Sequence, residues 1–338
     1  MLLKRKRKYI DTDYILLSGM IWELEPKLIN AEIADKLLRE EKVEDCLKII
    51  GESLYEYGSF EDYTQQELEE KIVEKRNKNY KMLADYAPYP ECVDVFRSKY
   101  DYHNAKVLVK SPDGNIDDSI MSDAGIVSAQ DMKEAYLDGN YAKVPQEIAL
   151  TIKEAKEVLE KTKDPQMADN VLDKAYFKNA LKVAEEVGGE YFNEFIRLQI
   201  DGTNLRTAVR LMRMDITGEY AQGVMLEDGD VPVSRLVQCC TQRDSVSSIY
   251  ENTMFAEAAK LGDKLKDGGS FSEFEKAIEN VYVEKAHIAR ISGFGENVII
   301  GFMFGLEQEF TTLRTIISGK LSGQSEETIR ERLRDLYV

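Results

Sequence analysis

A motif of one acid, one amide and two bases occurs twice in this chain, one hundred residues apart. In each copy the amide follows the acid by three residues, the bases follow it by five and nine, and a phenylalanine precedes it. The copies are Asp101, Asn104, Lys106 and Lys110, after Phe96, and Asp201, Asn204, Arg206 and Arg210, after Phe195. Repetition at a fixed spacing indicates that the chain uses one structural unit more than once.

A third, weaker copy follows near the end of the sequence. Glu309, Thr312 and Arg314 keep the spacing of acid, polar residue and base. A chain of 338 residues accommodates three units of about one hundred residues, which is a usual domain size. We therefore expect units at 1–95, 96–194 and 195–301, closed by helices within 302–338.

The residues around these motifs have the periodicity of helices. Apolar residues recur at steps of three and four in the second copy and in the third, which predicts helices packed lengthwise on other helices. Asp201 and Arg206 flank the apolar seam, so we expect both to form salt bridges with neighbouring helices. Asn104 and Asn204 lie farther from the apolar seam around the helix. Each could form a hydrogen bond to a neighbouring loop or face solvent, and the sequence does not distinguish these alternatives.

The whole chain reads as all-α. It contains seven prolines, and alternation of apolar and polar residues between turn signals is nearly absent. Ser272, three residues before Glu275, predicts a helix start, and so does Ser325, which precedes two glutamates.

The overall charge limits the partners. Lys and Arg number 45 against 62 Asp and Glu, a net charge of −17, so a broad nucleic-acid surface is not expected. The apolar stretches Tyr14–Trp22 and Val298–Leu306 have nine residues each, too few for a membrane span of roughly 20. The basic run Lys4–Lys8 fits either a solvated terminus or a contact with a membrane surface.

No catalytic constellation stands out. Of the two histidines, His287 follows Glu284 with the spacing of a di-iron ligand pair, but the required second pair is missing, so we expect a half-buried helical histidine. Gly319-Lys320 lacks the remaining residues of a phosphate-binding loop. The four cysteines have no zinc or disulfide spacing. We expect no metal, no cofactor and no direct nucleotide binding.

With the repeat established, the sequence resembles the C subunit of archaeal and bacterial V-type ATPases, a relative of the eukaryotic d subunit. The similarity lies in three segments, in order along the chain. They are Tyr102-His-Asn104-Ala-Lys106, the stretch from Ala175 to Asp201-Gly-Thr-Asn204-Leu-Arg206, and the stretch from Gly293-Phe-Gly295-Glu296 to Gly319-Lys320.

The resemblance implies a funnel of three similar helical domains around a pseudo-threefold axis. In that family the open face receives the central shaft, the closed face sits on the membrane proteolipid ring, and other subunits hydrolyse ATP. It thus implies a non-catalytic rotor subunit, peripheral to the cytoplasmic side of the membrane, in proton or sodium transport. A free-standing helical scaffold that binds another protein is the alternative. We expect structural or interface roles for Asp101, Asn104, Lys106, Asp201, Asn204, Arg206, Glu309 and Arg314.

Overall fold

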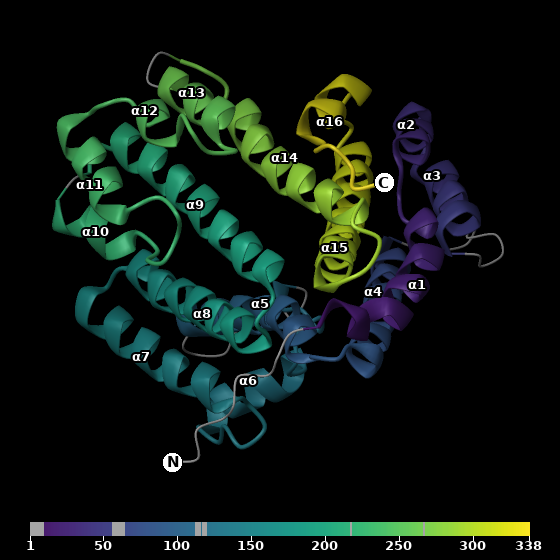
Figure 1. Ribbon diagram of the computed structural model, residues 1–338, viewed down its shortest axis with the longest axis horizontal. Helices are drawn as coiled ribbons and strands as arrows, with labels where there is room; N and C mark the ends of the chain where they lie inside the picture. The colour runs from purple at the N-terminus through teal and green to yellow at the C-terminus, as the bar shows by residue number, and fades with distance from the viewer. Residues whose placement is uncertain (1–9, 56–64, 112–115, 117–119, 217, 266–267) are drawn as a thin grey trace.

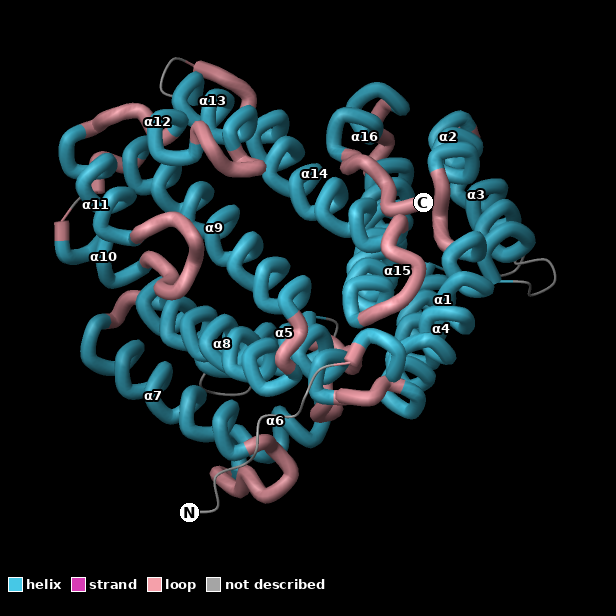
Figure 2. Tube along the Cα trace, viewed as in Figure 1, coloured by secondary structure: helices cyan, strands magenta, loops and turns pink. Residues whose placement is uncertain are grey.

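The computed structural model describes residues 10–55, 65–111, 116, 120–216, 218–265 and 268–338. The basic run Lys4–Lys8 lies outside these residues. Within them the chain forms helices and loops and contains no strand, so the prediction of an all-α fold is confirmed (Figure 2).

The first part of the chain, up to the first copy of the motif, forms short helices and one long one. Their bounds are η1 Asp11–Tyr14, α1 Ile15–Leu24, η2 Glu25–Lys27, α2 Ala31–Arg39, α3 Val43–Ile50, η3 Gly51–Tyr55 and α4 Gln65–Tyr86. The middle contains α5 Glu91–Lys110, α6 Ala129–Asp138, α7 Gln146–Thr162, α8 Pro165–Val187 and α9 Glu190–Arg213. The remainder contains α10 Glu219–Val224, α11 Val233–Gln242, α12 Ser247–Tyr250, α13 Ala256–Lys264, α14 Phe271–Arg290, α15 Glu296–Leu321 and α16 Glu326–Arg332.

Each copy of the motif lies on one of the long helices: the first on α5, the second on α9 and the third on α15. Figure 1 shows α5–α8, α9–α14, and α15 and α16 with α1–α4, as three neighbouring groups of helices. The third group therefore contains both ends of the described chain.

The buried apolar side chains form one large cluster and two smaller ones. The large cluster joins α1, α4, the end of α8, the length of α9 and the starts of α5 and α15 with the helices α10–α14. One smaller cluster fills the space between α5, α6, α7 and α8, and the other joins α2 and α3 to the second half of α15. Helix α9 thus lies within the large cluster along its length, whereas α5 and α15 start in the large cluster and end in the smaller ones.

Two local predictions were wrong and one was right. The hydroxyl of Ser270, rather than Ser272, accepts the amide of Glu273 and starts α14, since Ser270 and Glu273 have the same capping spacing two residues earlier. His287 is exposed instead of half-buried, and its Nε2 lies 2.9 Å from the carbonyl of Leu336. Ser325 caps α16 as predicted, accepting the amide of Thr328.

Candidate functional site at the convergence of the repeated helices

The first copy of the motif fixes the loop that follows α5. Asp101 accepts hydrogen bonds from the backbone amides of Ile126 and Val127, both at 3.0 Å. Asn104 bonds both backbone groups of Ser122: its Nδ2 donates to the carbonyl at 2.8 Å, and its Oδ1 accepts the amide at 2.9 Å. The acid and the amide together hold a loop about 20 residues away in sequence, which satisfies its buried backbone groups.

The second copy makes the same contacts. Asp201 accepts the amides of Asp230 and Val231, both at 3.1 Å. Asn204 donates to the carbonyl of Leu226 at 2.8 Å and accepts the amide of the same residue at 2.8 Å. Instead of the expected salt bridge, Asp201 makes charge-assisted bonds to a loop. Both asparagines bond a loop, which answers the question that the sequence left open.

A glycine lies against the acid in each copy. A Cβ atom added to Gly125 would lie 2.2 Å from Asp101 Oδ1, and one added to Gly229 would lie 2.2 Å from Asp201 Oδ1. Burial raises the pKa of both carboxyls to about 6, and the amides they accept only partly offset this effect. The close approach of backbone to carboxylate is therefore a property of the repeated unit.

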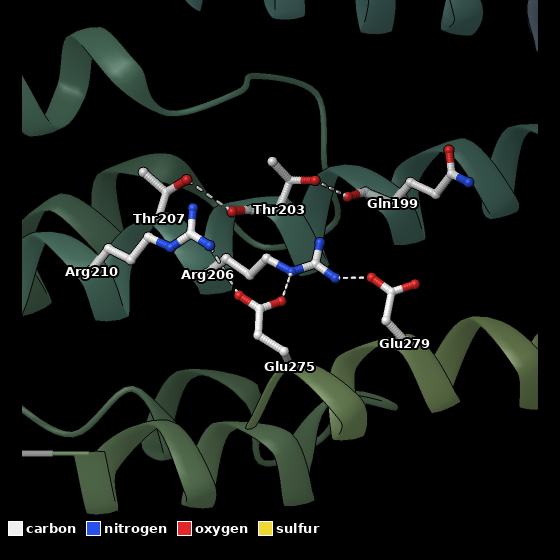
Figure 3. Close-up of polar contacts among 7 residues, drawn as sticks. All are labelled: Gln199, Thr203, Arg206, Thr207, Arg210, Glu275 and Glu279. Atoms are coloured by element: carbon white, nitrogen blue, oxygen red, sulfur yellow. Dashed lines mark hydrogen bonds and ion pairs between the residues drawn. The ribbon is translucent and has the colours of Figure 1, made fainter. Parts of the chain in front are cut away.

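The bases of each copy fix a second helix. On α5, Lys106 pairs with Asp173 at 2.5 Å and Lys110 with Asp169 at 3.0 Å, both acids belonging to α8. On α9, Arg206 pairs with two glutamates of α14, and Arg210 shares one of them. These partners are Glu275, 2.6 Å from Arg206 Nε and 3.1 Å from Arg210, and Glu279, which contacts the other end of the Arg206 guanidinium (Figure 3).

In the third copy the acid holds a segment from the other end of the chain. Glu309 accepts the amide of Ile29 at 2.9 Å, 280 residues earlier, and pairs with Lys75 of α4 at 2.7 Å. Burial raises the pKa of Glu309, and Lys75 opposes that shift. Thr312 is buried, and Arg314 lies 5.9 Å from the ring of Phe310. The loop that follows the acid in the first two copies is thus replaced here by a segment that precedes α2.

The three repeated helices meet near their starts. The ring of Phe195 lies 6.3 Å from that of Phe96 on α5 and 5.8 Å from that of Phe304 on α15. Phe96 and Phe304 also line a pocket of about 290 Å³. Its lining comes from all three helices and from α8, α14 and the end of the chain: Phe96, Lys99, Tyr176, Phe177, Gln199, Thr203, Arg206, Glu279, Tyr282, Phe304, Glu307, Gln308, Thr311, Thr312 and Arg334.

Glu307 connects this pocket to a buried aromatic network. Its carboxylate accepts the hydroxyl of Tyr80 at 2.5 Å and the hydroxyl of Tyr100. Arg76, 3% exposed, also bonds Tyr100, and its guanidinium lies between the rings of Tyr100 and Phe310, 4.6 and 4.5 Å from their centroids. Helices α4, α5 and α15 are therefore joined by a polar network that adjoins the pocket.

Of the eight residues expected to have structural or interface roles, Arg206 alone lines the pocket, together with Phe96 and Thr312 from the motif copies. The other seven are engaged in contacts on the flanks of the repeated helices. Lys99, Glu307 and Arg334 were not predicted from the sequence. The alignment of the motif contains a signal for Lys99 and Glu307, because each stands two residues before the repeated acid, as Gln199 does in the second copy.

Other features of the described residues bear on chemistry and membranes. The four cysteines are buried, and burial raises the pKa of Cys46 to about 11 and that of Cys92 to about 12. Among these residues no three His, Cys, Asp or Glu side chains gather as a metal ion would require. No helix in the described ranges is both long enough and apolar enough to cross a membrane.

An all-helical chain with a repeated helix and a pocket at the convergence of its copies defines a class, the all-α repeat proteins. The model of the ATP synthase (C/AC39) subunit family matches residues 17–332, and the chain therefore belongs to that family. The resemblance to the C subunit of V-type ATPases is thereby confirmed.

Three relatives match almost the whole chain at low identity. The C subunit of the V-type sodium ATPase of Enterococcus hirae is 22% identical over 329 residues, which are 96% of this chain and 99% of that protein. The C subunit of the A-type ATP synthase of Methanosarcina mazei is 22% identical, with 97% and 94% covered. The corresponding protein of Thermoplasma volcanium is 21% identical, with 95% and 98% covered.

Proposed function

We propose that this chain is a non-catalytic rotor subunit of a V/A-type rotary ATPase. It couples the central shaft to the membrane proteolipid ring and so transmits torque in ATP-linked proton or sodium transport. It lies on the cytoplasmic side, peripheral to the membrane. The units 1–95, 96–194 and 195–301, with the closing helices 302–338, form a funnel with pseudo-threefold symmetry, and catalysis belongs to other subunits.

The observation that carries the proposal is the pocket at the convergence of α5, α9 and α15. A shaft that turns with this subunit needs a socket to which all three repeated helices contribute. The pocket meets this requirement, because its lining includes residues from the helix of each copy of the repeat. The contacts of the motif support stiffness, because Asp201 fixes a loop while Arg206 fixes α14. The eight residues singled out from sequence thus have structural roles in this proposal.

An exposed apolar surface supports the second contact, with the ring. Helix α1 buries Leu17, Ser18 and Ile21, yet its opposite face is also apolar. The loop after α14 adjoins helix α1, since the amide of Gly295 lies 3.4 Å from Ser18 Oγ. We define this apolar end surface as Ile15, Leu16, Trp22, Ile288, Ile291 and Phe294, of which Leu16 is 68% and Ile291 86% exposed. A large exposed apolar patch marks an interaction site, and we propose that these residues form one.

The test is affinity purification of the chain from detergent-solubilised native membranes, with partners identified by mass spectrometry. The tag is placed at the amino terminus, because Tyr337, next to the last residue of the sequence, is buried and a tag beside it would disturb its packing. The proposal predicts recovery of the shaft, the nucleotide-binding subunits and the proteolipid, with ATP hydrolysis. Recovery of the chain alone would contradict it and favour the free-standing scaffold.

A pair of variants separates the two contacts. The double variant Leu16→Ser with Ile291→Ser is expected to retain the shaft and lose the proteolipid. Leu321→Ser is the matched control, because Leu321 is 50% exposed but lies at the far end of α15, about 39 Å from Gly295 at 1.5 Å per residue. Equal recovery of the proteolipid with both variants would contradict the assignment of this surface.

A further inference from the structure

The acids that line the pocket are already paired within the chain. Glu279 contacts the guanidinium of Arg206, and Glu307 accepts the hydroxyls of Tyr80 and Tyr100. The hydroxyl of Thr203, which also lines the pocket, already donates a hydrogen bond to the backbone carbonyl of Gln199 at 2.8 Å (Figure 3). The charge of Glu279 is therefore compensated by Arg206, whereas Glu307 has hydrogen-bond donors but keeps its negative charge.

Two cations at the same pocket are not compensated. Lys99 is exposed and makes no ion pair or hydrogen bond with the residues that the structure describes. Arg334 donates only to the carbonyl of Arg332, at 2.7 Å, and has no carboxylate partner among those residues. In a chain of net charge −17, a pocket with two unpaired cations is a local reversal of charge.

From this charge pattern we infer that the pocket receives an acidic protein segment, whose carboxylates pair with Lys99 and Arg334. The inference rests on the proposed function and gives the chemistry of the shaft end that enters the pocket. Charge complementarity of this kind guides encounter and excludes wrong partners. Part of the lining is aromatic, with Phe96, Tyr282 and Phe304, so the segment also carries apolar residues. A small inorganic anion would leave these rings uncovered and most of the 290 Å³ unfilled.

The same pocket selects one angular orientation of the segment. Lys99, Gln199 and Glu307 occupy the same position of the repeat, two residues before each acid, and all three line the pocket. A socket built from three similar helices would otherwise accept an insert in three orientations. Because these positions carry a cation, an amide and an anion, only one orientation puts an acid beside Lys99 and away from Glu307. Like charges brought together oppose the other orientations.

The first test measures binding of the full-length chain to the purified shaft subunits of the same organism at several salt concentrations. Lys99→Gln and Arg334→Gln are each expected to weaken binding roughly three- to tenfold and to reduce its dependence on salt. Lys161→Gln is the matched control, because Lys161 is an exposed lysine on α7 away from the pocket, and it should bind as the wild type does.

The outcomes separate the inference from the proposed function. Binding of both pocket variants with wild-type affinity and salt dependence overturns the inference, while the binding itself still supports a shaft-binding subunit. Failure of the wild type to bind overturns both. A third outcome is that millimolar inorganic phosphate displaces the shaft and that Lys99→Gln abolishes phosphate binding. This result would overturn the inference that the ligand is an acidic protein segment, and would identify a small anion as the ligand instead.

The second test addresses orientation. Thr203 and Thr311 are equivalent positions, each two residues after the repeated acid, and both line the pocket. A photo-crosslinking amino acid placed at each, in the assembled complex, is expected to label different residues of the shaft. Labelling of one common set of shaft residues from both positions would overturn a single orientation.

Discussion

The hydroxyl of Tyr337 donates a hydrogen bond to the carboxylate of Glu25, 312 residues earlier in the chain. Glu25 also lies 3.4 Å from Arg290 Nε, and the guanidinium of Arg290 is 5.5 Å from the Tyr337 ring. A Cβ atom on Gly305 would lie 2.4 Å from that ring, so α15 makes room for it. The segment after α16 is thereby anchored to the start of the chain across α14 and α15.

Removing this hydroxyl should destabilise the fold. Tyr337→Phe keeps the ring but leaves the buried Glu25 carboxylate with one partner fewer, which we expect to cost about 1–3 kcal/mol in the free energy of unfolding. Urea denaturation followed by circular dichroism measures this. Tyr86→Phe is the control, because Tyr86 is 52% exposed and its change should be close to zero. Equal midpoints for the two variants would contradict the role of the Tyr337 hydroxyl.

The contact of Gly229 with Asp201 predicts a second effect. In Gly229→Ala the new methyl group overlaps Asp201 Oδ1, so the loop must shift, at a cost of about 1–3 kcal/mol. Gly223→Ala is the matched control: a Cβ there meets nothing within 4 Å, and alanine in α10 should be neutral or stabilising by up to about 1 kcal/mol. Thermal unfolding of both variants distinguishes these results, and a wild-type midpoint for Gly229→Ala would refute the prediction.

The raised pKa of Asp201 predicts a pH dependence. Its pKa is about 6 in the folded chain against an ordinary value of 3.8, so the folded state binds this proton more tightly. The resulting contribution to stability is complete below about pH 4 and is lost as the pH rises through about 6. Asp201→Asn lacks this titration.

The comparison is made with urea unfolding at a series of pH values. The difference in unfolding free energy, wild type minus Asp201→Asn, should fall as the pH rises from about 4 to about 7, because only the wild type loses that proton. Groups other than Asp201 cancel in this difference. A difference that stays constant, or that grows with pH, would show that burial does not raise this pKa.

Arg206 should matter more for stability than its neighbour Arg210. The side chain of Arg206 is 17% exposed and lies between Glu275 and Glu279, so Arg206→Ala leaves two acids facing each other and should cost about 2–4 kcal/mol. Arg210 is 58% exposed, and Arg210→Ala should cost less than about 1 kcal/mol. The reverse order of the two melting temperatures would be incompatible with the packing of α9 on α14.

The all-α fold and the repeated helices could be predicted from the sequence, because both depend on local periodicity and on a motif with fixed spacing. The partners of the motif could not be predicted from it. Asp201 bonds amides that lie 29 and 30 residues later, and Glu309 bonds an amide 280 residues earlier. The helical wheel places a side chain on one face of its helix but does not identify the loop that covers that face.

The pocket was missed for a similar reason. Lys99, Glu307 and Arg334 belong to no local pattern of catalytic or binding residues, and they come together only when α5, α15 and the segment after α16 meet. His287 shows the opposite error, since its position within a long helix suggested partial burial, whereas α14 turns that face to solvent. Exposure depends on the neighbouring helices, and the sequence of one helix does not reveal which neighbours it has.

Ion transport by the reconstituted enzyme tests the central claim most directly. Complexes assembled with and without this subunit are placed in liposomes, and ATP hydrolysis is measured together with the uptake of protons and of sodium. A coupling role predicts that complexes without the subunit still hydrolyse ATP but transport neither ion, and that adding the purified chain restores transport. Ion transport at the normal ratio to hydrolysis in its absence would contradict that role.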